Sequence, residues 1–192
     1  YMLPLPSTFN YDHNLTCGFD WKDFEDNSSG EPMPVEYLPL TAGYASYMSD
    51  KYGTTQFSAD LNLLIRNLFV NDQNEFAEKQ LGASGNYIYL TAGLERRQKL
   101  AHDFSLFVKL DGQLADQPLV SNEQYSAGGV NSVRGYKEAE ISADNSLHGT
   151  LELFAPDLFN KTMVIPYLFY DFAWLGNREA PAGEDQPLVR WR

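Results

Sequence analysis

The residues that most often carry catalytic or metal chemistry share no productive spacing in this 192-residue chain. The three histidines, His13, His102 and His148, lie far apart in the sequence, whereas structural zinc sites draw their ligands from closely spaced groups. Glu138 and Glu140 form a carboxylate pair, but no nucleophile or basic partner accompanies them, so a solvated loop explains them better than acid–base catalysis. We therefore expect no metal, no cofactor and no enzymatic activity.

Charge, cysteine content and hydropathy argue against three further features: nucleic-acid binding, an internal disulfide and a membrane-spanning helix. The chain has 26 acidic and 14 basic residues and a formal charge of −12, which argues against binding the phosphates of a nucleic acid. Cys17 is the only cysteine, so an internal disulfide is excluded. The longest apolar run, residues 163–170, is far shorter than the roughly 20 residues of a membrane-spanning helix, but a membrane-spanning β-strand needs only about 9 to 11. A membrane β-barrel therefore stays open.

Alternation of apolar and polar residues is the dominant pattern, and it predicts an all-β, antiparallel fold. In residues 87–95, for example, Ile88, Leu90, Ala92 and Leu94 interleave with more polar neighbours. About seven such strands of roughly ten residues are expected, longer than strands in soluble sheets usually are. They cover residues 15–21, 37–47, 58–66, 87–95, 104–113, 147–153 and 164–174.

The connections between these strands alternate in length. Those at residues 49–53, 98–103 and 156–162 are short, whereas those at residues 27–34, 67–84 and 115–145 are longer. Short turns at one end of a sheet and long loops at the other are typical of an outer-membrane barrel. A soluble antiparallel β-sandwich also alternates, so periodicity alone leaves both architectures open.

The longest connection, residues 115–145, contains the tetrapeptide Val133, Arg134, Gly135 and Tyr136. This tetrapeptide resembles the one that outer-membrane polypeptide translocators and insertases carry on their sixth extracellular loop. The flanking residues extend the match: Glu123-Gln124-Tyr125, Gly128-Gly129 and Asp144-Asn145. With these flanks, the chain looks most like the haemolysin activation and secretion proteins, the two-partner secretion branch of that superfamily.

The resemblance implies that this loop folds back into the barrel. A guanidinium there is largely removed from water and needs a carboxylate, preferably one that it contacts through two hydrogen bonds. Asp171 occupies the corresponding strand and is the expected partner of Arg134. Gly135 would permit a tight turn, and Tyr136 would pack against the wall, near Phe169 or Glu152. Ala173 stands where the family often has glycine, which is a local departure from the pattern.

The resemblance also implies a wider architecture. Residues 1–192 are expected to form part of a C-terminal, antiparallel transmembrane β-barrel of about sixteen strands in the bacterial outer membrane, in contact with its lipids. The implied function is export of an unfolded partner exoprotein. The residues expected to line the lumen are polar or charged: Asp20, Lys22, Asp60, Asn62, Arg66, Glu95, Lys109, Asp111, His148, Thr150 and Glu152.

Two other functions remain open from the sequence. An insertase related to the barrel-assembly proteins shares the loop motif but folds other barrels into the membrane, and the flanking residues favour secretion over it. A soluble β-sandwich could instead bind glycans through the many tyrosines and tryptophans. The sandwich would bury the apolar side of its sheet against a second layer, so the exposure of that side distinguishes it from a barrel.

Overall fold

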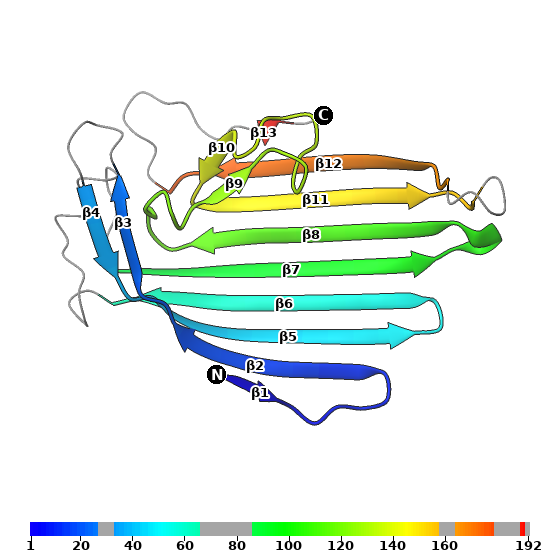
Figure 1. Cartoon of the computed structure of the whole chain (residues 1–192), viewed down its shortest axis with the longest axis horizontal. Coiled ribbons are helices and arrows are strands. Elements are labelled where there is room, and N and C mark those ends of the chain that lie inside the picture. The colour runs from blue at the N-terminus through cyan, green and yellow to red at the C-terminus, as the bar shows by residue number, and fades with distance from the viewer. Residues whose placement is uncertain (27–32, 66–85, 158–163, 179–188, 191–192) are drawn as a thin grey trace.

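The computed structural model describes residues 1–26, 33–65, 86–157, 164–178 and 189–190 (Figure 1). Its main element is an antiparallel sheet in the order β1-β2-β5-β6-β7-β8-β11-β12-β13. The long strands of this sheet are β2 (Tyr11–Phe19), β5 (Leu40–Asp50), β6 (Gly53–Leu64), β7 (Tyr87–Lys99), β8 (Ser105–Ala115), β11 (Asn145–Phe154) and β12 (Tyr167–Gly176). Each predicted strand therefore corresponds to a strand of the sheet.

Shorter elements complete the described structure. Strands β1 (Met2–Pro4) and β13 (Val189–Arg190) form the two edges of the sheet. Two hairpins stand outside it, one of β3 (Lys22–Asp26) with β4 (Met33–Tyr37) and one of β9 (Tyr125–Ala127) with β10 (Ile141–Ala143), and a single 3₁₀ turn, η1, spans Ala101–Asp103. No helix in the described part of the chain is long and apolar enough to cross a membrane.

The boundaries of several predicted strands were wrong. Strand β2 ends at Phe19, so Trp21 lies beyond it, and Tyr37 belongs to β4 rather than to the long strand that begins at Leu40. Strand β12 begins at Tyr167, directly after Pro166. Proline has no backbone N–H to donate to a ladder, which explains why the strand does not include it.

The strand register separates two faces of the sheet. Because residues directly opposite each other on paired strands point to the same side, the alignment of Leu61, Leu90 and Leu114 places all three side chains on one face. This face, here called the outer face, is apolar, and its leucines are 38%, 39% and 62% exposed. No second layer covers it in the described residues, so the β-sandwich expected as an alternative is not the architecture observed.

The opposite face, here called the inner face, carries the core. One buried cluster lies between the ends of β6 and β7, the β3–β4 hairpin and the segment after β8; it comprises Tyr37, Leu64, Tyr87, Tyr89, Ala115, Leu119 and Val120. A second cluster joins the β9–β10 hairpin to β12 and comprises Ala127, Ala143, Ala173 and Leu175. Loop segments, rather than a second sheet, therefore cover the inner face.

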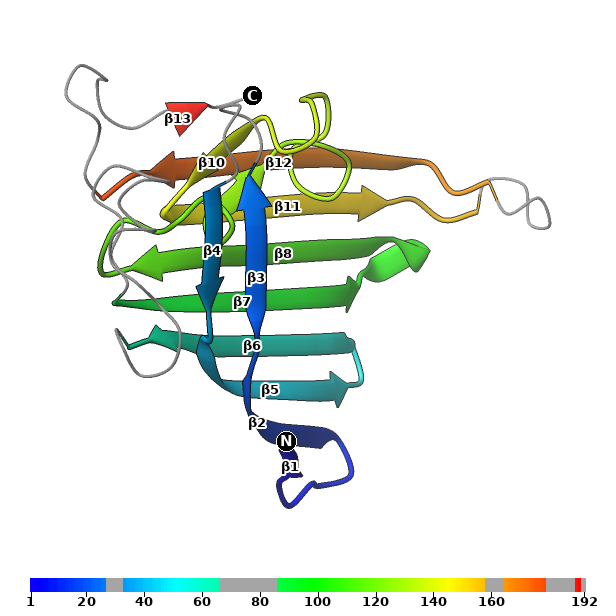
Figure 2. The same ribbon diagram turned by 60° about the vertical axis from the view of Figure 1, so that its left-hand side comes forward.

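Long and short connections lie at opposite ends of the sheet. Figure 1 shows the turns after β5 and β7 at one end and the segment between β8 and β11 at the other, the end at which β2 leads into β3. In Figure 2 the β3–β4 hairpin and the segment between β8 and β11 extend over the same side of the sheet. The alternation of loop lengths predicted from the sequence is confirmed for these connections.

Candidate functional site

The segment between Ala115 and Asn145 is a structured loop that folds back over the inner face. Within it β9 pairs with β10, with Ala127 opposite Ile141 and Tyr125 opposite Ala143. We refer to residues 116–144 as the inner loop. The family resemblance implied the inward fold. The hairpin was not expected, because three-residue strands are too short to produce a periodic pattern.

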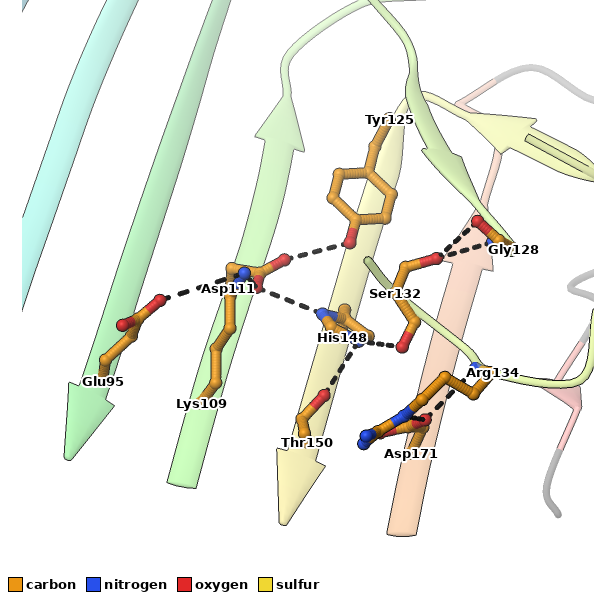
Figure 3. Close-up of polar contacts among 10 residues, drawn as sticks. All are labelled: Glu95, Lys109, Asp111, Tyr125, Gly128, Ser132, Arg134, His148, Thr150 and Asp171. Carbon is orange, nitrogen blue, oxygen red and sulfur yellow. Dashed lines mark hydrogen bonds and ion pairs between the residues drawn. The ribbon is translucent and has the colours of Figure 1, made fainter. Parts of the chain in front are cut away.

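Arg134, near the tip of the inner loop, pairs with Asp171 on β12 (Figure 3). Its Nε donates to Asp171 Oδ2 over 2.7 Å and its Nη2 to Oδ1 over 2.6 Å, so the contact is bidentate. The backbone N–H of Arg134 adds a third bond to Oδ2, at 3.1 Å. The predicted pair is confirmed.

Two further wall residues complete the site of Arg134. Its Nη1 donates to Oε1 of Glu152 on β11 over 2.6 Å, and its guanidinium carbon lies 3.8 Å from the ring centroid of Phe169. The hydrogen bonds with Asp171, joined by the bond to Glu152 and by both charges, raise the pKa of Arg134 further above its ordinary value, against the opposing effect of burial. The guanidinium is therefore charged at every physiological pH.

The residues around Arg134 give the loop its shape. Gly135 has φ +93° and Gly128 has φ +118°, conformations that other residues rarely adopt, and a Cβ on Gly128 would lie only 2.1 Å from the carbonyl oxygen of Lys137. Val133 packs against the cluster formed with Ala173. Gly135 thus supplies the backbone freedom expected of it.

Tyr136 lines a small cavity together with Val133, Ala173 and Leu175. Arg134 contacts both Phe169 and Glu152, the two wall residues near which Tyr136 was expected to pack. Ala173, the departure from the family pattern, is buried in this region, where a small side chain leaves room for the β9–β10 hairpin.

A second attachment joins the inner loop to β8 and β11. His148 is fully buried; its Nε2 donates to the carbonyl of Ser132 over 3.0 Å and its Nδ1 lies 3.1 Å from Oδ1 of Asp111. Tyr125 donates to the other carboxylate oxygen of Asp111 over 3.0 Å (Figure 3). His148 and Asp111, expected only to line the lumen, therefore also position the loop.

The base of the loop is held by Asp144, which is 1% exposed. Its Oδ1 accepts bonds from the backbone of Leu119 and from Gln124 Nε2, both at 2.9 Å, and its Oδ2 accepts the backbone N–H of Arg178 at 3.0 Å. Gln113 Nε2 donates to the carbonyls of Asp144 and Glu123. In the sequence, Gln124 and Asp144 stood out only because they flank the tetrapeptide and match the family. In the structure, these two residues bind each other and close the base of the loop.

A third attachment, not predicted from the sequence, joins the loop to the β3–β4 hairpin through Glu123. This carboxylate is 2% exposed and accepts bonds from Lys22 Nζ at 2.5 Å, Tyr37 Oη at 2.6 Å and Tyr89 Oη at 2.7 Å. Burial, followed by the charge and hydrogen bond of Glu123, raises the pKa of Tyr37, which keeps the phenol protonated and able to donate. We call Glu123 with Lys22, Tyr37 and Tyr89 the Glu123 cluster.

The predicted lumen residues fall into three groups. Most share the inner face with the loop: Asp60, Asn62, Glu95, Lys109, Asp111, His148, Thr150 and Glu152. Asp20 and Lys22 were wrongly assigned to the wall strand, because β2 ends before them and Lys22 begins β3. Arg66 lies outside the described residues. Within the described part of the chain, no group of three or more His, Cys, Asp or Glu side chains is arranged to hold a metal ion.

Comparison with known proteins identifies the family. A sequence model described as haemolysin secretion/activation protein ShlB/FhaC/HecB matches residues 10–190. The chain belongs to this family. The match favours the secretion branch that the flanks of the tetrapeptide indicated.

Two individual relatives of this ShlB/FhaC/HecB chain are named as transporter proteins. HuxB of Haemophilus influenzae, named a heme/hemopexin transporter protein, is 30% identical over 143 residues, and HuxB of strain Rd is 28% identical over 138 residues. In both comparisons the match covers 69% of this chain but 24% of the relative, so the chain spans about a quarter of their length.

A solved structure shows the same fold. CdiB from Escherichia coli superposes with a TM-score of 0.77 at 16% identity, over 94% of this chain and 34% of that one. The likeness shows the fold: the antiparallel sheet of this chain has the arrangement of part of that β-barrel.

Proposed function

We propose that this chain is part of an outer-membrane transporter that exports a large partner exoprotein by two-partner secretion. In this proposal, residues 1–192 belong to the C-terminal barrel domain, the apolar outer face contacts outer-membrane lipids, and the exoprotein passes the inner face in an unfolded form. Export requires neither a catalytic group nor a cofactor nor a nucleic acid. The membership of the chain in the ShlB/FhaC/HecB family and the transporter names of its relatives support this function.

The attachment of Arg134 to the wall is the observation that carries the proposal. A mostly buried guanidinium that contacts two carboxylates from β11 and β12 holds the inner loop inside the barrel, beside the polar wall. Removing one partner of a buried ion pair costs about 3–5 kcal/mol, because the other charge stays buried without compensation. The loop is therefore held in one conformation, which we propose supports conduction.

Arg134→Ala in the full-length protein tests the function. We expect secretion of the exoprotein to fall strongly while the amount of folded barrel in the outer membrane stays near normal, because the strand register does not depend on Arg134. Lys137→Ala is the matched control, since Lys137 is an exposed cation on the same loop. Normal secretion by Arg134→Ala at normal barrel levels would contradict the proposed role of the loop.

A further inference from the structure

The inner face changes in chemistry along the strands. Near the inner loop it is polar, but on β8, β11 and β12 the register places aromatic residues on this face toward the short turns, the end that lies to the right in Figure 1. We call Phe107, Phe154, Tyr167 and Phe169 the aromatic ladder. The register places Phe154 opposite Tyr167, and both Phe107 and Phe169 opposite Glu152, so all four share the face of Glu152.

Three of the four rings lie in one row and are partly open to solvent, whereas the ring of Phe107 lies under the guanidinium of Arg97, 4.6 Å from its centroid. The rings of Phe154 and Tyr167 stack with centroids 5.4 Å apart and planes inclined by 22°, and Tyr167 lies 6.0 Å from Phe169. Tyr167 and Phe169 are 49% and 50% exposed. The guanidinium of Arg134 covers the far end, at Phe169, so the ladder runs from the turn end of the wall to the attachment of the loop.

This arrangement differs from the aromatic girdle of a membrane barrel. Girdle residues face outward, where their rings meet the lipid headgroups. The ladder residues alternate with Leu153 and Leu168, which belong to the outer face. The ladder thus exposes apolar surface on the hydrated side of the wall, at the end where short, periplasmic turns are expected.

We propose that the aromatic ladder contacts the unfolded exoprotein as it enters the pore from the periplasm, an inference that rests on the proposed export function. An extended chain places side chains on one side about every 6.8 Å, close to the 6.0 Å between the rings of Tyr167 and Phe169 along β12. Aromatic surfaces accept apolar and aromatic side chains with little demand on sequence. Contacts that are individually weak and repeated along the path hold a polypeptide without stopping its movement.

Photo-cross-linking in the full-length transporter tests this contact. A benzophenone amino acid at position 154 or 167 is compared with the same residue at 153 or 168, one position along on each strand and on the outer face. We expect adducts with the co-expressed exoprotein from 154 and 167 and none from 153 and 168. Adducts only with the transporter's own chain, or equal yields from the two faces, would overturn the proposal.

Substitution provides a second measurement. Phe154→Ser with Tyr167→Ser is expected to lower the secretion rate about 3- to 10-fold at an equal level of folded barrel, because both rings are lost. An unchanged rate in the double variant would count against the ladder. A wild-type protein that exports nothing would contradict the proposed function, whereas normal export without adducts from 154 or 167 would contradict the ladder alone.

Discussion

At the scale of single residues, Asp171 contributes more to the attachment of the inner loop than Glu152 does. Asp171 accepts three hydrogen bonds from Arg134, including one from its backbone, whereas Glu152 accepts one. Asp171 is also the more buried of the two, at 3% against 17% exposure of the side chain. The two carboxylates are therefore not equivalent, although both are ion partners of the same guanidinium.

We predict that Asp171→Asn destabilises the docked loop by about 2–3 kcal/mol and that Glu152→Gln does so by about 1 kcal/mol. The reason is that the amide keeps the shape of the side chain but removes the charge, and Asp171 loses more charge-assisted bonds. Hydrogen exchange of the full-length protein in detergent measures this as faster exchange of residues 125–136. Equal exchange in the two variants would show that the unequal bonding does not determine loop docking.

At the scale of elements, the Glu123 cluster joins two loop segments that lie far apart in the sequence. Lys22 on β3 and Glu123 in the inner loop are separated by 101 positions, and β7 contributes the third contact through Tyr89. The hairpin and the inner loop therefore share one buried carboxylate. If either the hairpin or the inner loop detaches, Glu123 loses part of its hydrogen bonds and the other element loses its contact with this carboxylate.

Lys22→Gln is expected to weaken both elements together. Loss of the ammonium leaves the buried Glu123 charge with the two phenols alone and costs about 1–3 kcal/mol. Hydrogen exchange is expected to rise in the β3–β4 hairpin and in residues 119–124, while residues around Arg134 stay protected. Lys51→Gln, an exposed position in the turn at the opposite end of the sheet, is the control. A rise confined to the hairpin would show that the two elements are not coupled.

The elements differ in how far the sequence predicts them. Strands such as β7 and β8 were predictable because a half-exposed strand repeats every two residues, whatever its neighbours are. The β3–β4 hairpin was not, because its contact with Glu123 depends on the folded chain. The pair of Arg134 and Asp171 was predictable through the resemblance of the tetrapeptide, whereas the contacts of His148 with Ser132 and Asp111 were hidden, since a buried histidine and a lumen histidine look alike in the sequence.

At the scale of the whole molecule, the two faces of the sheet are expected to respond oppositely to charge. Phe57 and Ser58 are neighbours on β6, but the register places Phe57 on the outer face with Leu94 and Ser58 on the inner face with Gly93. In a barrel within a bilayer the first position meets lipid and the second meets water. Phe57 and Ser58 lie at nearly the same height along the strand. Substitutions at the two positions therefore differ only in the face of the sheet that they alter.

Phe57→Arg is expected to destabilise the full-length barrel by about 2–4 kcal/mol, because a charge near the middle of the bilayer cannot be hydrated. Ser58→Arg is expected to change stability by less than about 1 kcal/mol, since the inner wall is hydrated and already carries Asp60 and Glu95. Urea unfolding of both variants in lipid vesicles measures the difference, and the gel mobility of the unheated protein reports the fraction of folded barrel. Equal losses for the two variants would mean that the outer face does not meet lipid, and the membrane assignment of this sheet would then fail.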